Sequence, residues 1–315
     1  MKTSTSSIHM GWFLVIAAII FLPVQHAQAA MGDGPRAYQL LPDGAKALAI
    51  YGISTEGNQT ADPGQIIKGA DLDVNLAVLQ YTHTFSIKGQ QSAVFGVLPF
   101  GEVKGSVNLP RRSLSANSSG IGDATLGGVF GIYGSPAVQA ENFASYKPGV
   151  TFGVLTKLGM PTGEYDESEV LNLGSNRWSM QFGLPTTYSI GKSLLDPSLT
   201  RFEILPSVTF YTDNDDPYHA DECEQDPLFN IEGHIIRNLH QAVWVSLDAI
   251  YTFGGETTTD GVADDNKQRA FFLGGTVNLM FSPSIGLRIT YGETVEHNDN
   301  GADGSMIRAL LSFVF

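Results

Sequence analysis

A histidine and several carboxylates at alternating positions are the residues of this sequence best suited to chemistry. His234 lies two positions from Glu232, which puts both side chains on one face of a predicted strand. Glu203 and Ser207 share the inward face of a neighbouring predicted strand. A nucleophile, a base and an orienting group within hydrogen-bond reach would make a hydrolase site. Paired charges that line a polar interior explain the same residues without catalysis, so both interpretations stay open.

The other candidate sites carry weaker signals. The Gly-rich stretch at residues 120–123 lacks a following Lys and Ser or Thr and does not open a helix, which excludes a phosphate-binding loop. Residues 213–226 hold seven carboxylates, but their spacing matches no defined calcium loop. A solvated loop, or one bridged to lipopolysaccharide through divalent ions, accounts for them. Carboxylates around Cys223 disfavour its thiolate, so we expect no reactive cysteine, no metal site and no cofactor.

The first thirty residues have the features of an export signal. Lys2 is followed by an apolar run at residues 12–22 that is too short to span a membrane, and Ala27, Gln28 and Ala29 form a small-residue cleavage site. We therefore expect a cleaved signal peptide at residues 1–29 and a periplasmic N-terminal lead at residues 30–45. A single cysteine excludes an intrachain disulfide. Export leaves a periplasmic, secreted or outer-membrane location in a Gram-negative cell.

Composition excludes several classes of protein. The chain has 35 Gly, 18 Phe and 11 Tyr, only 16% charged residues and no second long apolar run. Its apolar residues must therefore be distributed through alternating strands. The net charge of −14 argues against a nucleic-acid partner.

Strand-like segments recur at a steady interval and predict a transmembrane antiparallel β-barrel of about twelve strands over residues 46–315. The predicted strands are residues 46–54, 71–86, 91–103, 122–133, 147–159, 177–190, 200–212, 228–238, 241–253, 268–281, 284–293 and 305–315. Long connections, several of them acidic, alternate with mostly short ones, as external loops and periplasmic turns do in outer-membrane barrels.

Within the predicted strands, charged residues keep to one face. We assign that face to the lumen, because a charge facing lipid near the midplane costs about 2–4 kcal/mol. The lumen-lining candidates are Lys157, Glu203, Glu232, His234, Asp248, Arg288, Arg308, Trp244 and Phe272. Segments 71–86 and 91–103 are less regular: in the first, Leu72 and Val78 share a phase that Tyr81 does not, which indicates either a β-bulge or a different register from the one assigned.

The last strand has a wholly apolar face that ends on Phe315. We expect it to close the barrel by pairing with the first strand, to contact outer-membrane lipid, and to present Phe315 to the barrel assembly machinery.

Two stretches of the sequence are specific enough to compare with a known protein family. The segment Gly-Ile-Gly-Asp-Ala-Thr-Leu-Gly begins at Gly120, and Met-Pro-Thr-Gly-Glu-Tyr-Asp at Met160 leads to Leu-Asn-Leu-Gly-Ser-Asn-Arg-Trp at Leu171. Together they resemble the bacterial outer-membrane family described as meta-pathway of phenol degradation proteins, over about residues 47–315. The resemblance implies a transporter barrel that admits small hydrophobic or aromatic compounds. Turn residues in the second stretch would shape the third external loop, as a constriction or as a structural corner: Pro161, Thr162, Gly163, Tyr165, Asn172 and Asn176.

We therefore expect a channel for passive uptake of small hydrophobic or aromatic solutes, and no enzyme. The alternatives are a structural or adhesive barrel that works through its acidic loops and a barrel hydrolase that uses His234. With about twelve strands the lumen is narrow enough for side chains to fill much of it, which favours a selective or gated path over an open pore.

Overall fold

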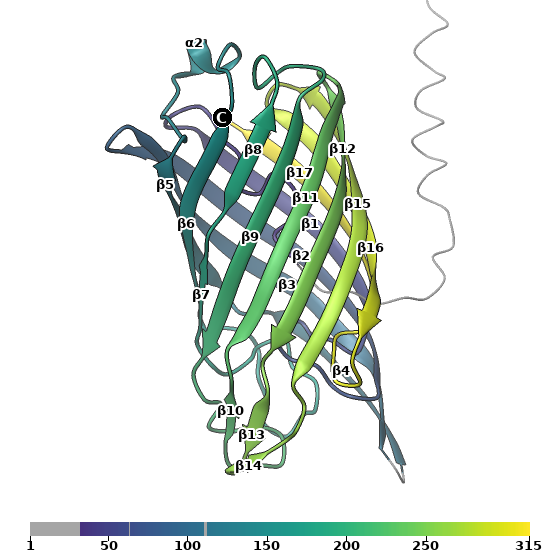
Figure 1. Ribbon diagram of the computed structural model, residues 1–315. Coiled ribbons are helices and arrows are strands. Elements are labelled where there is room, and N and C mark those ends of the chain that lie inside the picture. Colours follow the sequence, from purple (N-terminus) through teal and green to yellow (C-terminus); the bar gives the residue numbers. More distant parts are fainter. Residues whose placement is uncertain (1–31, 63, 110–111) are drawn as a thin grey trace, which may run out of the picture.

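The structure, a computed structural model, describes residues 32–62, 64–109 and 112–315. Fourteen strand segments form one closed antiparallel barrel of twelve strands, which tilt relative to the barrel axis (Figure 1). The predicted fold class is confirmed. The predicted signal peptide lies outside the described residues.

The barrel has more strand segments than strands because two of its strands are interrupted. One is divided at residues 122–124 into β4 and β5, and the other at residues 184–185, where Pro185 lacks the N–H that a ladder requires, into β7 and β8. The barrel segments are β1 (Lys46–Gly57), β2 (Ala70–Ile87), β3 (Gln90–Leu109), β4 (Arg112–Ile121), β5 (Thr125–Tyr133), β6 (Val150–Gly159), β7 (Ser179–Gly183), β8 (Thr186–Ile190), β9 (Thr200–Tyr211), β11 (Leu228–His240), β12 (Val243–Gly254), β15 (Gln268–Ser282), β16 (Ile285–His297) and β17 (Gly304–Val314).

Pairing of the first and last strands closes the barrel. β1 runs antiparallel to β17 in a regular register from Ala47–Val314 to Gly57–Gly304. The amide of Lys46 donates to the carbonyl oxygen of Phe315 and the amide of Phe315 donates back, both at 2.8 Å. The predicted closing strand is therefore confirmed, and no edge of the barrel sheet is left open at this seam.

The two faces of the wall differ as the alternation predicts. Ile235 and Leu247, on the outer face of β11 and β12, are 50% and 59% exposed, while the inward-facing Glu232, His234 and Asp248 are buried. On β17, Arg308 points inward and Ile307 outward. At these positions the apolar side chains face outward and the charged ones inward, as contact with lipid requires. No helix among the described residues is long and apolar enough to cross a membrane.

The connections make the two ends of the barrel different. We call them the short-turn end, where the C-terminus and the short helix α2 (Ala140–Phe143) lie, and the long-loop end (Figure 1). At the long-loop end, β10 (Cys223–Gln225), β13 (Thr257–Thr259) and β14 (Val262–Ala263) form a separate small antiparallel sheet.

Two sequence expectations are wrong in this part of the molecule. Residues 104–109 and 112–121, predicted as part of a loop, continue β3 and form β4, which pairs with β3 over its whole length. β2 contains no bulge, since its registers with β1 and β3 are unbroken. Its apolar residues Leu72 and Val78 point into the lumen, while Tyr81 points outward, so the strand changes from an apolar to a polar inner face without changing phase.

Candidate functional site: a divided lumen

A chain segment before the first strand lies inside the barrel. The amides of Asp33 and Gly34 donate to the two carboxylate oxygens of Glu232 at 3.0 and 2.6 Å. The amide of Arg36 donates to Glu203 at 2.8 Å. We call residues 32–45 the N-terminal segment. Within the stretch expected to be a periplasmic lead, the backbone donors of residues 33–36 find acceptors on the lumen side of β9 and β11.

Charged lumen side chains hold this segment from several sides. Lys157 on β6 forms an ion pair with Asp33, which also accepts a 2.5 Å hydrogen bond from the Tyr38 hydroxyl. Arg308 donates to the carbonyl oxygen of Gly32 at 2.7 Å. Arg288 likewise donates to the carbonyl oxygen of Pro35 at 2.6 Å. Six of the predicted lumen residues thus meet around one stretch of chain: Lys157, Glu203, Glu232, Arg288, Arg308 and, through Glu232, His234.

Gly34 shows how tightly the segment fits. Its φ is +87°, a conformation that side-chain-bearing residues rarely adopt. A Cβ at this position would also overlap the Arg308 guanidinium. Gly44, at the other end of the segment, has a φ of +73° but nothing within 4 Å of such a Cβ.

His234 belongs to a hydrogen-bond network and not to a nucleophile–base pair. Its Nδ1 lies 2.7 Å from Asp248 and its Nε2 lies 3.0 Å from Glu232, so both ring nitrogens face carboxylates. Ser246 and Thr276 donate to Asp248 at 2.7 and 2.6 Å. Neither hydroxyl is bonded to the imidazole, although a serine nucleophile requires that bond. The network instead orients Glu232 toward the N-terminal segment.

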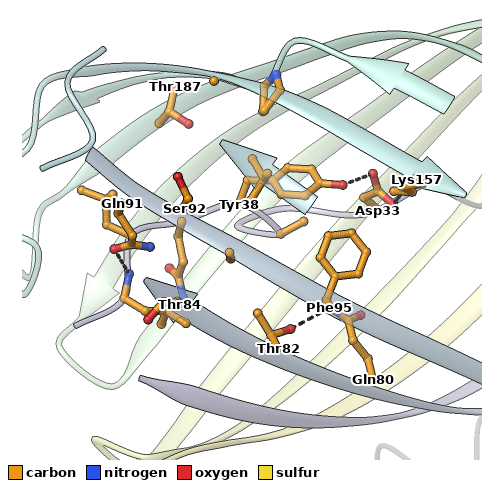
Figure 2. A pocket seen from close by; sticks show the side chains of 18 of the residues that line it. Asp33, Tyr38, Gln80, Thr82, Thr84, Gln91, Ser92, Phe95, Lys157 and Thr187 are labelled. Atoms are coloured by element: carbon orange, nitrogen blue, oxygen red, sulfur yellow. Dashed lines mark hydrogen bonds and ion pairs between the residues drawn. The ribbon is translucent and has the colours of Figure 1, made fainter. Parts of the chain in front are cut away.

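The N-terminal segment divides the lumen into two cavities of about 300 Å³ each. The short-turn cavity lies toward the end of the barrel that holds the C-terminus. Tyr38 and Phe95 border it (Figure 2), and so does Phe152. The long-loop cavity lies on the other side and reaches Gly64 and Tyr211. Gly32, Asp33, Thr125 and Lys157 border both cavities, so the ion pair between Asp33 and Lys157 lies at the division.

Two further lumen candidates, Trp244 and Phe272, are buried side chains of the inner wall. Phe272 is 1% exposed and packs against Ile250 and Met306. Trp244 lies under two guanidinium groups, with the carbon atoms of Arg36 and Arg288 at 4.6 and 5.0 Å from its ring centre.

The third external loop is built around Asp123, a residue to which the sequence analysis gave no role. Its carboxylate accepts the amides of Gly163 at 2.8 Å and Ser175 at 2.9 Å, and the Ser175 hydroxyl at 2.5 Å. The amide of Ala124 donates to the Thr162 hydroxyl at 2.9 Å. The break between β4 and β5 therefore joins the two motif stretches at one corner. The Gly and Asp residues of the two motif stretches were the sequence signal that could have indicated this contact.

The remaining loop candidates fix the loop's own shape. The side chain of Asn172 bonds the backbone of Asp166 in both directions, at 2.9 and 3.0 Å. Asn176 has a φ of +54° and donates to Asn214 at 2.8 Å, and the Tyr165 hydroxyl donates to the carbonyl oxygen of Asp216 at 2.8 Å. Pro161 precedes the bonded Thr162. These contacts are those that a structural corner requires.

Apolar residues of the same loop pack against the inner wall of the barrel. Leu171 and Leu173 are 1% and 3% exposed and pack against the inward face of β2, on Leu72, Val74 and Leu76. The loop thus covers the apolar half of the inner wall at the long-loop end. This packing explains why the inner face of β2 is apolar. The sequence alone did not show which residues would cover that face.

The acidic loop at residues 213–226 is held by its neighbours. Asp260 accepts the amides of Asp221 and Glu222 at 2.8 and 3.1 Å, and Cys223 pairs with Thr259 in the small sheet. Burial, with the nearby charges of Asp264 and Asp213, raises the pKa of the Cys223 thiol. The structure shows no group of three or more His, Cys, Asp or Glu placed to bind a metal within the described residues.

Comparison with known proteins places this barrel in a family. A family model described as "Putative MetA-pathway of phenol degradation" matches residues 55–306. The chain belongs to this family. The match includes both motif stretches, and it confirms the resemblance drawn from them. An integral outer-membrane location agrees with the family and with the apolar barrel surface.

Solved structures extend the family comparison. The COG4313 outer membrane channel from Pseudomonas putida F1 is similar at a TM-score of 0.73 and 22% identity, over 90% of this chain and 99% of that one. This likeness shows the fold. The CymD monoaromatic hydrocarbon channel aligns over 92% of this chain and 94% of that one, at 9% identity and a TM-score of 0.39, too low to support an argument. A search of curated proteins gives no match.

Proposed function

We propose that this family member is an outer-membrane channel for passive uptake of small hydrophobic or aromatic compounds, and that the N-terminal segment is its constriction. The observation that carries the proposal is the divided lumen. Two cavities of about 300 Å³ lie in line, one at each end of the barrel, with the Asp33–Lys157 ion pair between them. Such volumes suit one small molecule at a time.

The walls support this class of solute. Aromatic and aliphatic side chains line much of the short-turn cavity, among them Tyr51, Val78, Phe95 and Phe152. Hydroxyl and amide groups such as Thr82 and Gln80 lie between them (Figure 2). An apolar wall with a few polar groups is typical of small-molecule sites. Large solutes would be excluded by size, because the cavities on either side of the N-terminal segment are only about 300 Å³ each.

The testing experiment is uptake by proteoliposomes. Mature protein in liposomes should take up benzyl alcohol or a similar neutral aromatic solute faster than empty liposomes, with little uptake of a disaccharide. Rates equal to those of empty liposomes would contradict the proposal. Lys157→Ala, which removes the ion pair with Asp33, should raise the rate, whereas the exposed Lys104→Ala should leave it unchanged.

We further propose that the chain has no catalytic activity. Support comes from His234, whose ring nitrogens both face carboxylates, and from Ser246 and Thr276, which donate to Asp248. A lipase or protease activity that disappears in His234→Ala, but not in the exposed His240→Ala, would overturn this.

An adhesive role is the second candidate, because the acidic loop is folded and not a loose chain. Its pairing with residues 257–263 makes a three-stranded sheet that projects at the long-loop end (Figure 1). Bridging of its carboxylates to lipopolysaccharide by divalent ions would be one such contact. Deleting residues 216–221 should then abolish surface binding and leave aromatic uptake unchanged; reduced uptake with unchanged binding would count against adhesion.

A further inference from the structure

Three arginines gather around one carboxylate inside the barrel. Arg36 and Arg288 both lie against the Trp244 ring, at 4.6 and 5.0 Å. The amide of Arg36 donates to Glu203, whose other oxygen is 3.9 Å from Arg201. We call Arg36, Arg201 and Arg288 the arginine cluster. It brings together parts of the chain that are far apart in sequence.

The positive charge of this cluster exceeds what the protein supplies against it. Among the described residues, Glu203 is the one carboxylate that forms an ion pair with the cluster, and its 3.9 Å separation from Arg201 is long for a charged hydrogen bond. The chain as a whole carries a net charge of −14, so a shortage of acidic residues is not the cause. Many of the acidic residues lie in loops, with seven carboxylates in residues 213–226 alone.

Several guanidinium donors of the cluster are buried without a partner. Arg201 is 4% exposed, and its Nε and Nη1 have no hydrogen-bond acceptor among the described residues. The Nε atoms of Arg36 and Arg288 also lack one there. Buried polar groups in folded proteins are nearly always bonded, and a buried charge left without partners is strongly unfavourable. The cluster therefore has the donors of an anion site.

The residues around the arginine cluster indicate which kind of anion it would bind. Planar guanidinium groups match a carboxylate by paired hydrogen bonds. Arg288 borders the short-turn cavity with Tyr38, Phe95 and Phe152. A smaller cavity of about 20 Å³, bordered by Tyr38 and Thr187 as well, reaches Glu203 beside Arg201. A carboxylate bound at Arg288, the cluster residue that borders the short-turn cavity, would thus have its carbon skeleton next to an aromatic-lined space.

We propose that the arginine cluster binds the carboxylate group of a small aromatic acid, with its ring in the short-turn cavity. The proposal rests on the proposed function and names a class of solute for it. Arg201 supplies the unbonded donors, and Arg36, which belongs to the N-terminal segment, couples the bound acid to the constriction.

Tryptophan fluorescence tests this by equilibrium binding. Trp178→Phe leaves Trp244 as the single tryptophan after the expected signal peptide. Benzoate added to the purified, folded mature protein should change the Trp244 emission in a saturable way, and neutral benzyl alcohol should not. Arg201→Gln should weaken benzoate binding by about tenfold or more. The exposed Arg269→Gln serves as the matched control and should bind as the parent does.

Each other outcome contradicts the proposal. An equal response to benzyl alcohol, or unchanged binding in Arg201→Gln, would overturn the carboxylate site. Equal affinity for phosphate or acetate would overturn the assignment to aromatic acids. If Arg201→Gln fails to fold, Arg201→Lys keeps the charge, loses the planar donors and should still weaken binding. Binding in detergent needs no transport, so its failure is distinct from a failure of solute uptake.

Discussion

At the scale of single residues, the lumen is organised by charges that the sequence places far apart. Glu232 accepts two amides of the N-terminal segment, and His234 links it to Asp248. Inward-facing residues of β11 and β12 could be predicted from alternation alone. Their partners could not, because Asp33 and Gly34 lie about two hundred positions away in a stretch without periodicity.

His234→Ala should therefore destabilise the barrel interior. The substitution leaves the buried carboxylates of Glu232 and Asp248 without their shared partner, and breaking a buried ionic network costs about 3–5 kcal/mol. Urea unfolding followed by the loss of heat-modifiable mobility should show a lower midpoint. The exposed His240→Ala should unfold like the parent, and an unchanged midpoint in His234→Ala would contradict the role given to the network.

At the scale of elements, the alternation of apolar and polar residues predicted most of the barrel strands. It did not predict the contacts that loops make with those strands. β4 was missed because its Ser- and Asn-rich sequence has no apolar alternation. The apolar inner face of β2 suggested a bulge, because Leu171 and Leu173, which cover it, come from a loop about a hundred residues later. Asp123 was noted only as part of a motif, since its three hydrogen bonds depend on a loop whose path the sequence does not define.

Asp123→Ala should release the third external loop from the barrel. Three hydrogen bonds to its carboxylate are lost, each worth about 1.5–3 kcal/mol for a charged acceptor. A Glu-specific protease should then cut faster at Glu164 and Glu169, with the barrel still folded by gel mobility. Asp215→Ala, in the acidic loop, serves as the control. Equal cleavage in both variants would rule out Asp123 as the anchor.

Cys223 should react slowly with iodoacetamide at neutral pH. Because burial raises its thiol pKa, the thiolate forms only at higher pH than in a free cysteine, and the alkylation rate should rise over that higher range. The urea-unfolded chain is the control and should titrate at the ordinary thiol pKa. Identical pH profiles for the folded and unfolded chains would contradict the partly buried position of Cys223.

At the scale of the whole molecule, a lipid-facing barrel encloses a chain segment that divides its lumen. Closure depends on β1 and β17, and the outer face of β17 ends on Phe315. We propose that this terminal strand also serves as the assembly signal. Phe315→Asp should reduce the heat-modifiable folded fraction in outer membranes by several-fold, while Phe281→Asp, at the short-turn end of β15, should reduce it less. A normal folded fraction in Phe315→Asp would refute the signal.

The N-terminal segment as constriction is the central claim, and single-channel conductance in planar bilayers tests it most directly. Gly34→Ala forces a side chain against Arg308 and should displace the segment, whereas Gly44→Ala has a similar φ and free space around it. We expect small or absent conductance in the parent and in Gly44→Ala, and clearly larger steps in Gly34→Ala. Equal conductance in all three folded proteins would contradict the claim.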